Sequence, residues 1–122
     1  KNNFINIQGD DSLLFSLYQN AIALINTSKY EGFGIPNIEA MNLGCPVISS
    51  TFYTLKEIGG NSCLYFKNDN HLDLSNKMNY FLSNNNARKT YIKKGLKRSK
   101  MFSWAVCAKK TKNLYDYLTK KN

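Results

Sequence analysis

The apolar run Ala21-Ile22-Ala23-Leu24-Ile25 constrains the fold of this chain more than any other feature of the sequence. An uninterrupted apolar run of this length is typical of a strand that is covered on both faces. Two further short apolar segments, at 46–50 and 63–66, are also predicted to be strands. With the elements described below, the predicted order is β-α-β-α-β-turn-β-α-α-α, which indicates an α/β fold: a parallel sheet with flanking crossover helices.

The other elements are predicted from periodicity and from capping residues. Alternating apolar and polar residues predict one more strand over Phe4–Ile7. Helices are predicted where apolar residues recur at helical spacing next to capping Asp, Ser, Pro or Gly residues. They are expected over about 11–20, from Pro36 to Gly44, and over about 71–83, 86–101 and 104–119. Residues 51–61 are expected to form a loop with one helical turn at 55–58.

The segment that follows the first apolar run carries the strongest functional signal. Glu31 and Glu39 are separated by seven residues, which include two glycines, Gly32 and Gly34, and the helix-starting Pro36. Glycines let a backbone come close to a ligand, and a helix N-terminus favours a phosphate group. In a parallel sheet, ligands bind outside the carboxyl ends of the strands, where this segment is predicted to lie. The segment therefore offers an anion cradle between two carboxylates that can accept hydrogen bonds from hydroxyl groups, which are the requirements for holding a sugar diphosphate.

Length and composition are those of a single globular domain. The chain has 122 residues and is 43% hydrophobic. It contains no run of about 18 apolar residues, so no transmembrane helix is expected. The first residues include neither an initiator Met nor a signal peptide, which predicts a cytoplasmic fragment of a longer chain. Cys45, Cys63 and Cys107 are odd in number and widely spaced, which fits a reducing compartment, and each is expected to be a small buried residue.

The positive charge lies mainly in the second half of the chain. Residues 1–67 contain 4 Lys and Arg against 5 Asp and Glu, whereas residues 68–122 contain 13 against 3. Seven basic residues and no acidic residue lie in the stretch 88–100. The ordinary interpretation of such a stretch is a solvated helix face. The functional alternatives are contact with an anionic membrane surface or a nucleic-acid patch, and Tyr91 is the only aromatic residue available for stacking on bases.

Four blocks, in order, resemble the family 4 glycosyltransferases. The first is residues 28–41, Ser-Lys-Tyr-Glu-Gly-Phe-Gly-Ile-Pro-Asn-Ile-Glu-Ala-Met. The others are residues 44–50, Gly-Cys-Pro-Val-Ile-Ser-Ser; residues 57–61, Glu-Ile-Gly-Gly-Asn; and residues 102–104, Phe-Ser-Trp. Residues 5–21 are also similar to the strand, glycine, helix and tyrosine pattern of the family. The resemblance therefore covers nearly the whole chain.

This resemblance implies a fold, a reaction and a role for each site residue. Members of the family are retaining enzymes with two Rossmann-like domains (GT-B architecture), and residues 1–122 resemble part of the C-terminal, nucleotide-sugar-binding domain. Glu31 would contact the donor sugar as the catalytic carboxylate, and Glu39 would bind the ribose hydroxyls. The backbone of Gly32, Phe33, Gly34 and Ile35 would line the sugar and the diphosphate. No metal or other cofactor is expected.

The resemblance also defines the partners. The donor would be a nucleotide diphosphate sugar, and the acceptor would be a glycan or a lipid-linked glycan in cell-surface polysaccharide biosynthesis. The acceptor would bind a missing N-terminal domain, and the phosphate-binding Lys and Arg of the family would lie upstream, so this fragment is expected to be inactive alone. A location in the cytoplasm or at the inner face of the membrane is expected, and no nucleic-acid partner. Thr27, Tyr53 and Lys56 depart from the family pattern and leave the choice of donor open.

Simpler interpretations accompany each of these assignments. Glu31 and Glu39 could be surface carboxylates, or the acid pair of a hydrolase. His71 is expected to be solvated or to cap a helix, and Trp104 and Phe102 to pack in the core. For the whole chain, the alternatives are a basic nucleotide- or nucleic-acid-binding module without catalysis, or a sugar phosphorylase or epimerase of the same architecture.

Overall fold

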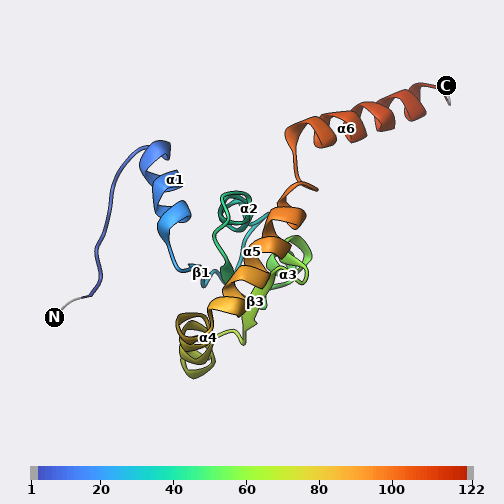
Figure 1. Ribbon diagram of the computed structural model, residues 1–122. Coiled ribbons are helices and arrows are strands. Elements are labelled where there is room, and N and C mark those ends of the chain that lie inside the picture. Colours follow the sequence, from blue (N-terminus) through green and yellow to red (C-terminus); the bar gives the residue numbers. More distant parts are fainter. Residues whose placement is uncertain (1–2, 121–122) are drawn as a thin grey trace.

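A computed structural model describes residues 3–120 as an α/β fold with three strands and six helices (Figure 1). The helices are α1 (Asp11–Asn20), α2 (Ile35–Asn42), α3 (Tyr53–Gly59), α4 (His71–Ser83), α5 (Asn85–Ser99) and α6 (Trp104–Thr119). The strands are β1 (Leu24–Asn26), β2 (Val47–Ser50) and β3 (Cys63–Phe66). The predicted fold class, a parallel sheet with flanking helices, is confirmed.

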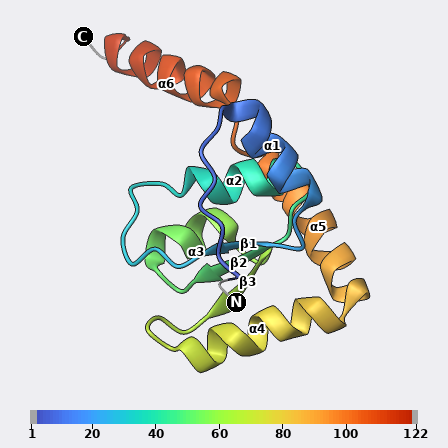
Figure 2. The same ribbon diagram turned by 90° about the vertical axis from the view of Figure 1, so that its left-hand side faces the viewer.

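The three strands form one parallel sheet in the order β1-β2-β3. The central strand β2 is buried at all four of its residues, because helices cover both faces of the sheet. Successive side chains of a strand point to opposite faces. Val47 accordingly packs in a cluster with Ala40 and Met41 of α2, whereas Ile48 packs in a second cluster with Phe81 of α4. Figure 2 shows α2 and α4 on opposite sides of the sheet.

Helix α5 packs against both α2 and α4 and completes the core. Gly95 of α5 lies so close to α2 that a Cβ atom there would come within 3.1 Å of the Met41 side chain. Tyr91, also on α5, packs edge-on against the fully buried Phe81 of α4, with 5.3 Å between the ring centroids. One face of α5, the helix that contains most of the basic stretch 88–100, therefore packs in the core of the domain.

Most predicted element boundaries are confirmed by the structure, but the strand predicted over 21–25 is not. It is β1 at Leu24–Asn26, and Ile22 and Ile25 are exposed because β1 is an edge strand of the sheet. The helices at 71–83 and 104–119 have the predicted limits, and the Ser103 hydroxyl accepts a hydrogen bond from the Val106 N–H, as expected for a cap. Asp10 caps α1 in the same manner through the Leu13 N–H. Gly44, just beyond α2, has a φ of +75°, the left-handed conformation expected of a glycine that ends a helix.

Several predictions are wrong, each for a tertiary reason. Phe4–Ile7 is an extended segment with Phe4 92% exposed, because no described strand lies beside it to pair with its backbone. Residues 53–59 form a complete helix, since Leu55 and Ile58 can both be buried. Cys45 and Cys63 are buried as expected, but Cys107 is exposed on α6. Trp104 is 86% exposed and does not pack in the core.

Within residues 3–120, no helix is both long enough and apolar enough to cross a membrane.

Candidate functional site

The candidate site lies at the carboxyl edge of the sheet, in the loop that joins β1 to α2. The backbone passes from Asn26, the last residue of β1, through Glu31 to Ile35, the first residue of α2. The loop therefore lies where parallel sheets bind their ligands. Glu31 is half-buried, whereas Gly32, Phe33 and Ile35 are exposed.

Gly34 gives the loop its shape at the start of α2. Its φ of +90° and ψ of +43° are left-handed values that a side chain would disfavour, and a Cβ atom there would lie 2.7 Å from the Leu55 side chain. Gly34 is the N-cap residue of α2, and no side chain caps this helix. Pro36, predicted at the first helical position, is the second residue of the helix. In this first turn Pro36 has no N–H, and the Asn37 N–H donates to the Gly34 carbonyl oxygen over 3.1 Å. The helix end therefore suits an anionic ligand chiefly through its dipole and the N–H of Ile35.

Glu31 is held by a buried amide that the sequence did not single out. The Nδ2 atom of Asn26 donates a hydrogen bond of 3.2 Å to Glu31 Oε1 and one of 2.9 Å to the Oδ1 atom of Asn37. Asn37 in turn donates to the hydroxyl of Ser49 over 3.2 Å. Two features of the sequence could have indicated this contact: a polar residue, Asn26, directly after an apolar run, and another, Asn37, in the first turn of the next helix.

Glu39 lies one turn into α2 and has a different neighbour from Glu31. It is half-buried beside Tyr18 of α1, whose side chain packs among Ala40, Met41 and Cys45. Burial raises the pKa of the Tyr18 hydroxyl, and the negative charge of Glu39 and a hydrogen bond to it raise this pKa further. The structure thus places both predicted carboxylates around the first turns of α2, with separate supports from β1 and from α1.

An aromatic contact connects the loop between β1 and α2 to the residues that follow α5. The rings of Phe33 and Phe102 meet edge-to-face with 6.0 Å between their centroids. The guanidinium of Arg98 lies 5.2 Å from the centroid of Phe102, and it donates hydrogen bonds to the carbonyl oxygens of Glu57 and Ile58 at the end of α3. Phe102 therefore supports the loop rather than filling the core, and Arg98 joins two elements that are 40 residues apart in sequence.

A hollow of about 320 Å³ lies at the same edge of the sheet. Its lining includes Ser28 and Lys29 after β1, Ser50 at the end of β2 and Phe66 at the end of β3. Lys29 and Asp69 form an exposed salt bridge of 2.5 Å at this hollow. His71 is also exposed there, as expected, and begins α4, while the neighbouring Asn70 caps that helix.

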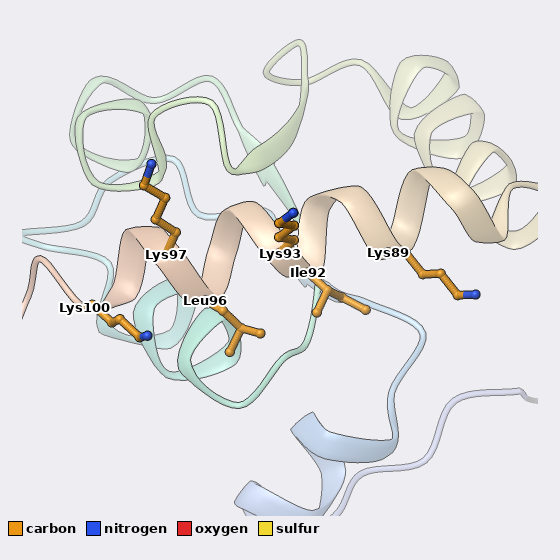
Figure 3. A pocket seen from close by; sticks show the side chains of 6 residues that line it. All are labelled: Lys89, Ile92, Lys93, Leu96, Lys97 and Lys100. Carbon is orange, nitrogen blue, oxygen red and sulfur yellow. The ribbon is translucent and has the colours of Figure 1, made fainter.

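A second hollow of about 370 Å³ runs along α5, away from the sheet edge. Figure 3 shows its six lining side chains, with Ile92 and Leu96 among four lysines. These lysines are Lys89, Lys93, Lys97 and Lys100. The other three basic residues of the stretch have partners within the fold. Arg88 donates to the carbonyl oxygens of Phe81 and Leu82, Arg98 holds the end of α3, and Lys94 lies over the ring of Tyr91.

Comparison with known proteins establishes the family. A family model described as glycosyl transferases group 1 matches residues 1–98. The chain belongs to this family. Its membership, expected from the four sequence blocks, is thereby confirmed.

Individual members of the glycosyl transferase group 1 family and a solved structure agree with this assignment. The chain is 34% identical over 102 residues to an O-antigen chain mannosyltransferase B of Escherichia coli, covering 84% of this chain and 27% of that protein. Over 53 residues it is 47% identical to the O-antigen chain mannosyltransferase RfbU of Salmonella typhimurium, covering 43% of this chain and 15% of the relative. A sucrose-phosphate synthase of Thermosynechococcus elongatus matches with a TM-score of 0.83 and 29% identity, over 94% of this chain and 30% of that one. The chain thus spans less than a third of the length of these proteins.

Proposed function

We propose that this chain is the donor-binding part of a retaining glycosyltransferase that builds a cell-surface polysaccharide. One observation carries the proposal: this chain belongs to the glycosyl transferases group 1 family, and two carboxylates lie at the carboxyl edge of its sheet. There Glu31 and Glu39 flank the start of α2, a helix whose N-terminus has no side-chain cap. The donor would be a nucleotide diphosphate sugar, and the acceptor a glycan or a lipid-linked glycan. Mannose is the first donor sugar to test, because two of the relatives are named as mannosyltransferases.

Each site residue has a proposed role in this reaction. Glu31 would accept a hydrogen bond from a hydroxyl of the donor sugar, and Glu39 would bind the ribose hydroxyls. The backbone from Gly32 to Ile35 and the N-terminus of α2 would stabilise the charge that develops on the departing diphosphate. The bond between the anomeric carbon and the diphosphate oxygen breaks while the acceptor oxygen bonds to the same face of that carbon. The acceptor proton passes to a diphosphate oxygen, so no metal ion is required.

The chain would supply one half of this site. We propose that this chain binds the donor but does not complete transfer by itself, since it spans only 27% of a relative that is named as a mannosyltransferase. The acceptor and additional contacts to the phosphates would come from the remainder of a full-length enzyme. Tyr53 is exposed at the start of α3, where it could stack on a ring of the donor and influence donor choice.

We also propose that the lysines of α5 rest on the anionic inner surface of a membrane, where a lipid-linked acceptor would be located. Lys89, Lys93, Lys97 and Lys100 lie along one helix with Ile92 and Leu96 between them. No acidic residue lies between 88 and 100 to oppose this attraction.

Replacement of the two carboxylates tests the proposed function. In the full-length protein, Glu31→Ala is expected to reduce sugar transfer by roughly 100-fold or more, because a contact made to the reacting sugar is lost. Titration with guanosine and uridine diphosphates is expected to show saturable binding to the chain itself, weakened by Glu39→Ala. Asp11→Ala, which removes an exposed carboxylate of α1 outside the site, is the matched control.

Three results would contradict the proposal. Unchanged transfer by the Glu31→Ala enzyme would exclude the catalytic role of this residue. Loss of transfer on chelation of divalent ions would show that the reaction needs a metal. Binding to DNA alone, with a steep dependence on salt, would favour the alternative of a nucleic-acid-binding module.

A further inference from the structure

Three buried polar side chains lie directly beneath the candidate site. Asn26 is 7% exposed, and Asn37 and Ser49 are 0% exposed. Asn26 and Ser49 are opposite each other in the register of β1 and β2, and Asn37 reaches them from the first turn of α2. Buried polar groups are costly unless they are hydrogen-bonded. Within residues 3–120, every buried side-chain nitrogen and oxygen atom has a partner. The cost of burying this group is therefore offset by a network.

The backbone determines how this network is oriented. The N–H of Ser28 donates a hydrogen bond of 3.0 Å to the Oδ1 atom of Asn26. An amide nitrogen could not accept that bond, so the Nδ2 atom of Asn26 must face Glu31 and Asn37. Asn37 consequently presents Oδ1 to Asn26 and donates through Nδ2 to the Ser49 hydroxyl. Each amide can therefore adopt only one of its two orientations.

The network also holds the loop that contains Glu31. Besides the bond from Asn26 to Glu31 Oε1, the Ser50 hydroxyl donates a hydrogen bond of 2.7 Å to the Ser28 carbonyl oxygen. The ends of both β1 and β2 thus hold the segment between Asn26 and Glu31. Asn37 is two residues before Glu39 on α2, so the same pair of asparagines joins the loop of the first carboxylate to the helix of the second.

We propose that Asn26 and Asn37 are positioning residues for the carboxylate pair, an inference that rests on the proposed function. Asn26 holds Oε1 of Glu31, so that Oε2 is the oxygen offered to the donor sugar. Asn37 keeps the Asn26 amide in place and connects it to α2. Neither asparagine contacts the donor; both act through the position of Glu31.

Two matched substitutions test this proposal in the full-length protein. Asn26→Asp replaces the donor to Glu31 Oε1 with an oxygen that cannot donate and that repels the carboxylate. We expect kcat to fall by roughly 100-fold, the scale of effect that a misplaced catalytic group produces. Asn37→Asp makes the same chemical change at the next buried position. Its carboxylate can still accept from Asn26 Nδ2 but no longer donates to the Ser49 hydroxyl, and it adds a negative charge near Glu31, so we expect kcat to fall as well, but less than in Asn26→Asp.

A second readout separates positioning from a general loss of stability. Affinity for the free nucleoside diphosphate is expected to fall much less than kcat in the Asn26→Asp protein, because the ribose contact is assigned to Glu39 and only the backbone contacts of residues 32–35 lie in the loop that Asn26 holds. Thermal unfolding of both variants reports how far each buried carboxylate destabilises the fold. Asn26→Ala, which removes the hydrogen bond without adding charge, is expected to reproduce the loss of kcat if the Asp variant does not fold.

The inference is overturned if Asn26→Asp retains parental kcat, or if the two Asp variants lose kcat and nucleotide affinity in parallel with stability. If Glu31→Ala by itself abolishes transfer, either result leaves the proposed function intact and removes only the positioning role. Retained transfer by Glu31→Ala would contradict the proposed function itself.

Discussion

At the scale of single residues, Gly32 and Gly34 have different environments although one residue separates them. Gly34 has left-handed backbone angles and lies against Leu55, whereas a Cβ atom on Gly32 would meet no atom within 4 Å. We expect Gly34→Ala to destabilise the fold by about 1–3 kcal/mol through strain. Gly32→Ala is expected to leave the free energy of unfolding nearly unchanged but to weaken donor binding, since its backbone is assigned to the donor. Urea unfolding and nucleotide titration measure the two effects.

The reverse pattern would contradict this assignment. If Gly32→Ala binds nucleoside diphosphates as tightly as the parent, the donor does not approach the backbone at this position. If Gly34→Ala unfolds at the parental urea concentration, the loop has adopted another conformation.

At the scale of elements, α5 combines a structural role with a proposed binding role. Three of its basic residues contact the rest of the fold: Arg88, Lys94 and Arg98. The other four line the hollow along α5: Lys89, Lys93, Lys97 and Lys100. We expect the chain to bind vesicles that contain anionic lipid and not neutral vesicles. Changing these four lysines to Gln is expected to abolish binding, because each lysine near an anionic surface contributes about 1 kcal/mol. Vesicle co-sedimentation at low and high salt measures this binding.

The matched control changes four lysines outside the α5 hollow to Gln: Lys56, Lys67, Lys77 and Lys110. If this control loses vesicle binding to the same degree, net charge rather than the α5 hollow is responsible. Binding to neutral vesicles that persists at high salt would exclude the electrostatic contact.

At the scale of the whole molecule, buried thiol and phenol groups predict how stability changes with pH. Burial raises the pKa of the Cys63 thiol to about 12 from its usual 9.0, and burial also raises the pKa values of Cys45, Tyr18, Tyr65 and Tyr91. Above about pH 9 these groups release protons in the unfolded chain but retain them in the fold, so the unfolded state binds fewer protons. The free energy of unfolding is therefore expected to fall as the pH rises from about 9 towards 12.

Urea midpoints measured between about pH 8 and pH 11 test this dependence. Lysines also lose charge in this range, so comparison with Cys63→Ala isolates one thiol. That variant is expected to show a shallower decline above about pH 9. A midpoint that is constant with pH, or a slope unaffected by the substitution, would contradict the prediction.

The sequence determined by itself the features that depend on neighbouring residues. The apolar runs predicted β2 and β3 and, at Leu24 and Ile25 only, β1, and capping by Asp10 and Ser103 was predicted from residue types that hydrogen-bond three positions away. The order of these elements specified a parallel sheet, and that sheet put Glu31 at its carboxyl edge. Local chemistry also identified Gly44 as the residue that ends α2, because a left-handed backbone favours glycine, whereas the left-handed angles of Gly34 were not predicted.

Only the tertiary structure decided which groups meet across the sequence. Phe4–Ile7 has the pattern of a strand but no described neighbour with which to pair, and Trp104 has the side chain of a core residue but no described surface to cover it. The contact of Tyr18 with Glu39, and that of Arg98 with the end of α3, join residues that periodicity cannot relate. The bond from Asn26 to Glu31 depends on an amide orientation fixed by a backbone N–H two residues away and on a partner in the next helix. Hydrogen bonds of this kind require positions in space, and a sequence specifies those positions only through the packing of the whole fold.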